Sequence, residues 1–203
     1  MVRNFLPRRH RVTEKKTKNM KIVETILPDL LIIEPDVYGD ERGYFFESFS
    51  FKKYNEQGAN FYFVQDNISK SKAGTVRGLH YQVGEKAQGK LCQVIKGRVL
   101  DVAVDIRFNS PAFGKYFSIE LSEDNHKQLW IPPGFAHGFS VLSDDVIFHY
   151  KCTEYYSKPH ERAILYNDPV LNINWMVDRP VVSEKDKSAK LFNDIEKDFI
   201  YNL

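Results

Sequence analysis

The sequence predicts an all-β protein built as a sandwich or barrel of short strands. Apolar and polar residues alternate over several segments, turn residues separate these segments, and helical patterns are few. Many short strands with frequent turns are typical of sandwiches and barrels. The strand-like segments comprise residues 79–82, 91–95, 100–106, 116–121 and 146–152.

The segment 100–106 shows the clearest alternation. Branched apolar residues occupy every second position, and Asp101 and Asp105 lie between them. This period of two predicts a strand with one buried face. Because Gly97 separates this segment from residues 91–95, we expect the two segments to pair as a hairpin.

Two short helices are expected outside the strands. Residues 51–57 form the first, and residues 183–199 form the second, near the C-terminus. Ser183 suits the N-cap of the second helix, and Asp186 lies in its first turn. The predicted fold is therefore all-β with a few short peripheral helices.

One domain accounts for the 203 residues, since barrels of this length commonly form single units. Residues 1–20 contain seven basic residues and one acidic residue, whereas residues 21–203 contain 22 basic and 26 acidic residues. We expect residues 1–20 to form a disordered basic extension, with an anchor for RNA or an anionic surface as the alternative. Residues 21–203 form the folded domain, and nothing in them requires a nucleic-acid-binding face.

The composition and the motifs that the sequence lacks exclude several classes of protein. No apolar stretch approaches the roughly 20 residues that cross a membrane, so no membrane association is expected. The sequence has no P-loop, dinucleotide-binding glycine pattern or Gly-x-Ser-x-Gly motif, so nucleotide-driven phosphoryl transfer, Rossmann-type hydride transfer and serine hydrolysis have no support. Cys92 and Cys152 are expected to be buried and reduced in the cytoplasm, with a single disulfide as the alternative.

The most informative motif surrounds His80 and resembles the metal-binding signature of the cupin family with two ligands replaced. Gly74 precedes His80 by six positions, and Gln82 stands where the cupin pattern has its second His. Lys90 stands where the Glu ligand belongs, while His137 remains in a Pro-x-Gly-x-x-His pattern. A divalent metal prefers carboxylate and imidazole to an ammonium. We therefore expect no metal, and a barrel pocket devoted to acid–base chemistry.

Residue types in this pocket suggest how that chemistry works. On a strand, His80 and Gln82 share one face, and a neutral imidazole can accept a proton. Lys90 can stabilise an oxyanion or bind phosphate, and Tyr150 can donate a proton from the opposite side. The alternatives are a hydrogen-bonded core histidine, a solvated loop lysine and a packing tyrosine. Asp186 either caps its helix or orients His80.

Other residues suit a phosphorylated, sugar-bearing ligand. The guanidinium groups of Arg42 and Arg77 suit phosphate. The aromatic residues after Arg42 can stack on a nucleobase, although an edge strand with a surface ion pair explains this segment equally well. The amides of Gln65 and Asn67 can bind sugar hydroxyls or a base edge.

Taken together, these residues resemble the dTDP-4-dehydrorhamnose 3,5-epimerase family. The resemblance covers about residues 22–190, nearly all of the chain outside the basic extension. The matching segments are residues 40–47, 65–69, 76–82, 88–91, 101–107, 110–114, 131–139, 150–151, 167–169, 173–175 and 183–186.

The resemblance implies a cupin-type double-stranded β-helix, or jelly roll, that works as a homodimer without cofactor. The implied reaction inverts C3 and C5 of dTDP-4-keto-6-deoxy-D-glucose, in dTDP-L-rhamnose biosynthesis. Carried over by position, His80 is the base and Asp186 its partner, while Tyr150 is the acid and Lys90 faces the C4 oxygen. The implied substrate-binding residues are Arg42, Phe45, Glu47, Gln65, Asn67, Arg77, His137, Glu161 and Lys185.

Three alternatives remain at this point. The first is a 3- or 5-monoepimerase of another deoxysugar pathway, because such enzymes share much of this framework. The second is a metal-dependent cupin enzyme with the metal at His80 and His137. The third is a nucleotide-sugar binder without catalysis, against which the intact His80, Tyr150 and Lys90 argue.

Overall fold

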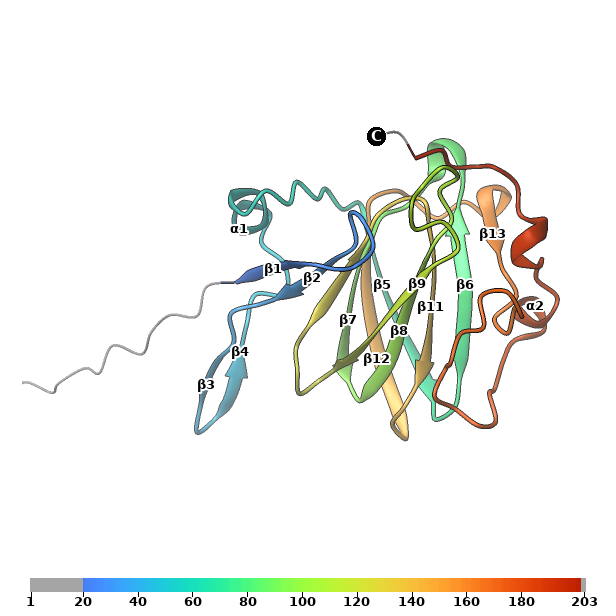
Figure 1. Ribbon diagram of the computed structural model, residues 1–203. Helices are drawn as coiled ribbons and strands as arrows, with labels where there is room; N and C mark the ends of the chain where they lie inside the picture. The colour runs from blue at the N-terminus through green and yellow to red at the C-terminus, as the bar shows by residue number, and fades with distance from the viewer. Residues whose placement is uncertain (1–19, 202–203) are drawn as a thin grey trace, which may run out of the picture.

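The computed structural model describes residues 20–201, which form two packed antiparallel sheets and a separate two-stranded hairpin (Figure 1). The expected basic extension, except Met20, lies outside the described residues. The six-stranded sheet has the order β1 (Lys21–Glu24), β2 (Leu31–Glu34), β10 (Gln128–Ile131), β7 (Lys90–Lys96), β12 (Asp145–Cys152) and β5 (Gln65–Lys72). The five-stranded sheet has the order β13 (Glu161–Ala163), β6 (Val76–Gln82), β11 (Phe135–Val141), β8 (Arg98–Asp105) and β9 (Tyr116–Ser122).

The remaining elements are short and peripheral. The hairpin consists of β3 (Tyr38–Asp40) and β4 (Gly43–Phe45), and Figure 1 shows it extending away from the two large sheets. The helices are α1 (Phe51–Glu56), α2 (Glu184–Lys187), and the 3-10 turns η1 (Gly84–Lys86), η2 (Lys158–His160) and η3 (Phe192–Asp194). The prediction of an all-β fold with short helices is confirmed.

Successive strands change sheets almost every time from β5 onward. The exception is the pair β8 and β9, which are neighbours in the five-stranded sheet. This alternation winds the chain around a common interior, as a double-stranded β-helix requires.

The predicted hairpin between residues 91–95 and 100–106 is wrong. β7 pairs with β10 and β12, whereas β8 pairs with β11 and β9, so the chain changes sheets between them. Gly97 makes this crossing with a φ of +82°, and a Cβ there would lie 2.2 Å from the backbone oxygen of Asp145. A tight glycine turn can therefore join two sheets as well as two paired strands.

β8 is buried on both faces, not on one as its alternation predicts. Its apolar face, including Leu100 and Val102, packs beneath Trp175 and Phe192 from the C-terminal part of the chain. Its other face points into the barrel, where Asp101 and Asp105 are completely buried. The polar face that solvent was expected to reach thus points into the barrel, and the C-terminal segment covers the apolar face.

The C-terminal helix is much shorter than predicted. Residues 183–199 were expected to be helical, but α2 has four residues, although Ser183 does cap it by accepting a hydrogen bond from the Asp186 amide at 3.2 Å. Tertiary hydrogen bonds then hold the chain: Leu165 N donates to Lys190 O at 2.8 Å, and Phe192 N donates to Asp168 Oδ2 at 2.8 Å. These bonds replace the ones that a longer helix would form.

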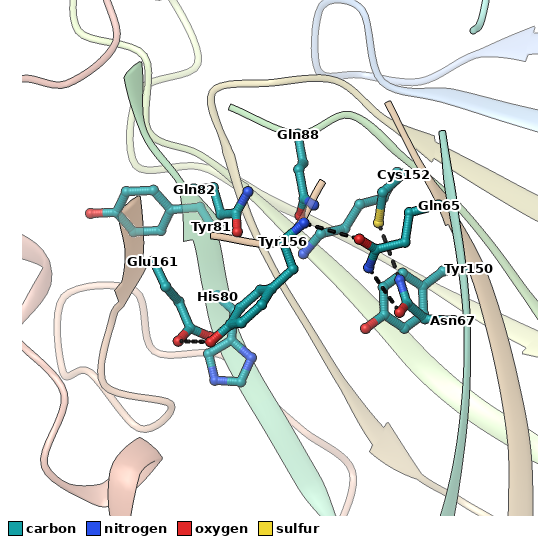
Figure 2. Close-up of a pocket in the computed structure, with 11 residues that line it drawn as sticks. Gln65, Asn67, His80, Tyr81, Gln82, Gln88, Tyr150, Cys152, Tyr156 and Glu161 are labelled. Atoms are coloured by element: carbon teal, nitrogen blue, oxygen red, sulfur yellow. Dashed lines mark hydrogen bonds between the residues drawn. The ribbon is translucent and has the colours of Figure 1, made fainter. Parts of the chain in front are cut away.

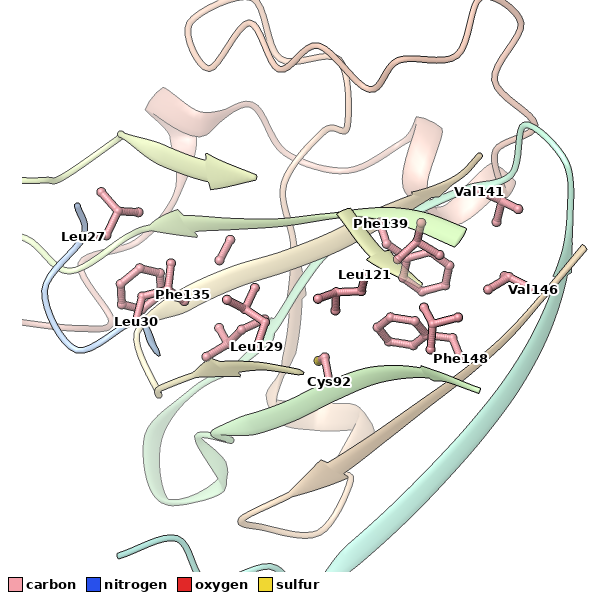
Figure 3. Packing of buried hydrophobic residues seen from close by; sticks show 14 of the residues in the cluster. Leu27, Leu30, Cys92, Leu121, Leu129, Phe135, Phe139, Val141, Val146 and Phe148 are labelled. Carbon is pink, nitrogen blue, oxygen red and sulfur yellow. The ribbon is translucent and has the colours of Figure 1, made fainter. Parts of the chain in front are cut away.

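The hydrophobic core lies between the two large sheets. Figure 3 shows Phe139 and Phe148 stacked there with ring centroids 4.4 Å apart, near Leu121 and Cys92. Cys92 and Cys152 are both buried and free, as expected. Across residues 20–201, no helix has the length and apolar character needed to cross a bilayer.

Candidate active site

A cavity of about 230 Å³ opens at one end of the barrel, where β5 and β7 begin and β6 and β12 end (Figure 2). Its lining is mostly polar. The lining residues are Gln65, Asn67, His80, Tyr81, Gln82, Gln88, Lys90, Tyr150, Cys152, Tyr156 and Glu161.

His80 forms a close pair with Asp186 in this cavity. His80 Nε2 lies 2.6 Å from Asp186 Oδ1, and the backbone N–H of Gly78 donates to Oδ2 at 3.4 Å. Since an ionised carboxylate only accepts hydrogen bonds, Nε2 carries the hydrogen and Nδ1 is the ring atom able to accept a proton. Burial raises the pKa of Asp186, but the hydrogen bond and charge of His80, together with hydrogen bonds from Gly78 and Ser183, outweigh burial and hold the pKa below its ordinary value. The Asp186 carboxylate therefore pairs with His80, while the Ser183 hydroxyl caps the helix.

An irregularity in β6 lets Arg77 and His80 face the same side of the sheet. His80 lies opposite His137 on β11, whereas Arg77 lies opposite Phe139, so the register shifts between them. Gly78 sits in this irregular part, and a Cβ there would lie 2.5 Å from the Cα of Gly138. Only glycine allows this close approach of the two strands.

Lys90 and Tyr150 line the same cavity from neighbouring strands. Within residues 20–201, no carboxylate lies within ion-pair distance of the Lys90 ammonium, which leaves it available to an oxygen atom of a ligand. Burial raises the pKa of Tyr150 to about 12, so its hydroxyl stays protonated at neutral pH and can donate. The cavity thus combines a proton acceptor, a proton donor and a cation.

Gln65, Asn67 and Glu161 lie at the cavity mouth. The Gln65 amide donates to Asn67 Oδ1 at 3.0 Å, and Asn67 donates to the Cys152 sulfur at 3.5 Å. Glu161 accepts from Lys185, whose Nζ lies 2.6 Å from its Oε2. Lys185 is therefore beside the mouth, tied to a cavity residue.

His137 lies opposite His80 on the neighbouring strand β11 and forms a second imidazole–carboxylate pair. Its Nε2 lies 2.6 Å from Asp101 Oδ1 and 3.8 Å from the Cys92 sulfur, and all three residues are buried. Burial lowers the pKa of His137 despite the nearby Asp101. Two separate imidazole–carboxylate pairs therefore lie side by side, His80 with Asp186 and His137 with Asp101.

Arg42, Phe45 and Glu47 do not reach the cavity within one chain. Arg42 pairs with Asp40 at 2.5 Å, Glu47 pairs with Lys53, and the Phe45 ring is 65% exposed. They lie on or just after the β3–β4 hairpin, which forms hydrogen bonds only between its own two strands among the ladders of the described chain. Arg77 also lies outside the cavity lining, where its Nε donates to Ser71 Oγ at 2.9 Å.

Sequence reasoning missed Tyr156 and gave no role to Gln82. The Tyr156 hydroxyl donates to Glu161 Oε2 at 3.1 Å, and Figure 2 shows its ring across the cavity mouth near His80. The pair Tyr155-Tyr156 just after a strand was the available signal. Gln82 lines the cavity, but its amide binds the backbone of Lys86, Tyr155 and Ser157, so it holds the mouth loops together.

The fold and the site together define a class. The barrel is a jelly roll, and its cavity contains an imidazole–carboxylate pair, a neutral phenol and an ammonium. These groups are typical of an enzyme that moves protons to and from its substrate. A family model described as dTDP-4-dehydrorhamnose 3,5-epimerase matches residues 24–194, so the chain belongs to that family of isomerases.

Individual relatives agree with this assignment. A dTDP-4-dehydrorhamnose 3,5-epimerase of Shigella flexneri is 53% identical over 87% of this chain and 98% of its own length. The crystal structure of a dTDP-6-deoxy-D-glucose-3,5-epimerase of Legionella pneumophila, in complex with dTDP-4-keto-L-rhamnose, is 50% identical with a TM-score of 0.87, covering 91% of this chain and 100% of that one. These matches confirm the expected cupin-type jelly roll.

A more distant structure bears on the alternative activity. A 3'-monoepimerase of Streptomyces bikiniensis in complex with dTDP-quinovose is 29% identical, with a TM-score of 0.79, over 83% of this chain and 86% of that chain.

Proposed function

We propose that this protein inverts C3 and C5 of dTDP-4-keto-6-deoxy-D-glucose, giving dTDP-4-keto-L-rhamnose. The observation that carries the proposal is the His80–Asp186 pair, which shares one cavity with Lys90 and Tyr150. The 53% identity to a dTDP-4-dehydrorhamnose 3,5-epimerase over nearly its whole length supports the same substrate.

In each inversion His80 removes the proton from the carbon next to the C4 ketone. The electron pair of the C–H bond forms the enolate double bond, and the negative charge moves to the C4 oxygen. The Lys90 ammonium stabilises that charge inside the cavity. Tyr150 then donates its proton to the opposite face of the carbon; afterwards solvent returns a proton to the phenolate and takes the proton that His80 had removed.

The nucleotide extends beyond the cavity. A volume of about 230 Å³ is below the roughly 300–1,000 Å³ of sites that enclose a whole drug-sized ligand. We therefore assign the cavity to the sugar ring, with Gln65, Asn67, His137 and Glu161 beside it. Arg77 is assigned to the phosphates outside, and Lys185, which pairs with Glu161, to the sugar at the cavity mouth.

Arg42, Phe45 and Glu47 would serve the site of a second subunit. The hairpin that carries Arg42 and Phe45 exposes aromatic rings to solvent, with Tyr44 57% and Phe45 65% exposed. Such an arm fits a homodimer in which each hairpin reaches the cavity of its partner. There Phe45 would pack on the base and Arg42 would bind phosphate.

Mixing two inactive variants tests this arrangement. Arg42→Ala and His80→Ala homodimers should each be inactive, but mixed dimers should regain activity. In a mixed dimer, the chain with intact His80 receives Arg42 from its partner. No recovery after subunit exchange, verified by differently tagged chains, would show that each hairpin serves its own chain.

Proton NMR in D2O tests the reaction itself. With dTDP-4-keto-6-deoxyglucose as substrate, the double epimerase introduces deuterium at both C3 and C5. Deuterium at one carbon alone would indicate a monoepimerase. The similarity to the 3'-monoepimerase of Streptomyces bikiniensis supports this alternative. We place the reaction in the cytoplasm, which the two free cysteines support.

A further inference from the structure

Helix α2, which carries Asp186, is tied to strand β13 by an ion pair. Lys185 Nζ lies 2.6 Å from Glu161 Oε2, and the same oxygen accepts from the Tyr156 hydroxyl at 3.1 Å. The Glu161 side chain is 18% exposed and that of Lys185 is 54% exposed. The carboxylate of this ion pair is therefore largely shielded from solvent, whereas the ammonium is partly exposed.

Helix α2 is too short to be stable without contacts to the rest of the chain. It has four residues, and a single helical turn is unstable without tertiary contacts. The second imidazole–carboxylate pair differs in this respect, because Asp101 and His137 both lie on adjacent strands whose ladder fixes them. The position of Asp186 depends instead on the contacts that hold α2 against the rest of the chain.

The Glu161–Lys185 pair completes a closed ring of contacts around His80. β13 pairs with β6, so that Ala163 lies opposite His80 and Glu161 lies opposite Gln82. Lys185 directly precedes Asp186, whose carboxylate returns to His80 at 2.6 Å. The strand that positions His80 is therefore linked, through Glu161, to the helix that positions Asp186.

We propose that Glu161 and Lys185 act as a clamp that holds α2 at the distance at which Asp186 orients His80. They are positioning residues in this role, which rests on the proposed function and goes beyond binding the substrate. A partly exposed ion pair adds little stability. The effect of the ion pair is on the position of Asp186 and His80, because a displacement of about 1 Å at a reacting group can cost up to about 100-fold in rate.

Lys185→Met tests the clamp, because it keeps the aliphatic stem and removes the ammonium. We expect kcat for dTDP-4-keto-6-deoxyglucose to fall about tenfold, within the range of such misplacements, while dTDP binds as tightly as to the wild type. The far-downfield proton resonance of the short His80–Asp186 hydrogen bond should weaken or disappear. Exchanging the charges, as in Glu161→Lys with Lys185→Glu, should restore the resonance, because the ion pair is rebuilt.

Two comparisons separate positioning from other effects. Lys187→Met is the matched control, since Lys187 pairs with Glu184 inside α2 at 2.7 Å and should leave kcat and the resonance unchanged. In an Asp186→Asn background, Lys185→Met should cause no further loss of kcat, because nothing remains to be positioned.

Other results would overturn the clamp. A weaker dTDP affinity or a raised KM with kcat unchanged would mean that Lys185 only contacts substrate. A further loss in the Asp186→Asn background, or an unchanged resonance in Lys185→Met, would do the same. If the wild-type protein exchanges no deuterium into this substrate, the proposed function fails, and the resonance still decides whether the clamp exists.

Discussion

Replacing Lys90 by Met should abolish most of the catalysis without harming the fold. The enolate oxygen carries a full negative charge, and an ammonium about 4 Å away stabilises it by about 4 kcal/mol at an effective dielectric constant of about 20. At about 1.4 kcal/mol for each tenfold change, this corresponds to a loss of almost 10³-fold in rate. Removing a single hydrogen-bond donor from an oxyanion site typically lowers the rate by about 10²–10³-fold, which agrees with this value.

Stability should not fall in this variant. Lys90 lines the cavity and forms no ion pair with a carboxylate of residues 20–201, so Met removes a half-buried charge that no protein anion balances. The melting temperature should stay the same or rise. dTDP, which lacks the 4-keto hexose, should bind with unchanged affinity.

The assay is the rate of deuterium incorporation at C3 and C5, followed by proton NMR. Lys96→Met is the matched control, because Lys96 lies at the other end of β7 and pairs with Asp145 at 2.9 Å on the surface. Its rate should equal that of the wild type. A Lys90→Met enzyme with near-normal turnover would refute the role of the ammonium in stabilising the enolate.

The remaining predictions concern the other catalytic groups and the core. His80→Ala and Tyr150→Phe should each lose at least about 10²-fold in exchange rate, the usual contribution of a general acid or base, while dTDP titrations show intact binding. Because the pKa of Asp186 is held below its ordinary 3.8, its ionised form stabilises the fold at neutral pH, and this contribution is lost as pH falls below about 3.8. The melting-temperature difference between the wild type and Asp186→Asn should therefore shrink below that pH, and a constant difference would contradict the pairing. Phe148→Ala, at a completely buried site, should lower the unfolding free energy by about 3–5 kcal/mol in urea titrations, and a loss below about 1 kcal/mol would contradict its place in the core.

The sequence was most informative where chemistry depends on residue type. His80, Lys90 and Tyr150 were selected because an imidazole, an ammonium and a phenol have few uses together inside a barrel. The structure brings all three to one cavity. The spacing from His80 to Asp186 carried no geometric information, and the link between them came from the family resemblance.

Burial on both faces of β8 could not be predicted. Alternation shows that the two faces of a strand differ, but it does not show which face the rest of the chain covers. The apolar face of β8 lies under Trp175 and Phe192, and the face with Asp101 points into the barrel. The partner of a sheet face is decided by packing of distant segments.

Local signals also could not fix connections and lengths. A glycine turn such as Gly97 suits a hairpin and a crossing between sheets equally well, because both need a sharp reversal with positive φ. The helix expected over residues 183–199 ends after Lys187, because hydrogen bonds from Leu165 and to Asp168 hold the following residues.

By itself the sequence determined the β-rich fold and the family and indicated the candidate catalytic groups, because alternation and side-chain chemistry are local properties. Only the tertiary structure decided that Arg42 and Phe45 lie outside the cavity of their own chain, and that Glu161 pairs with Lys185 on the helix carrying Asp186. Those facts depend on how segments far apart in the chain pack together, and side-chain free energies at single positions do not encode that packing.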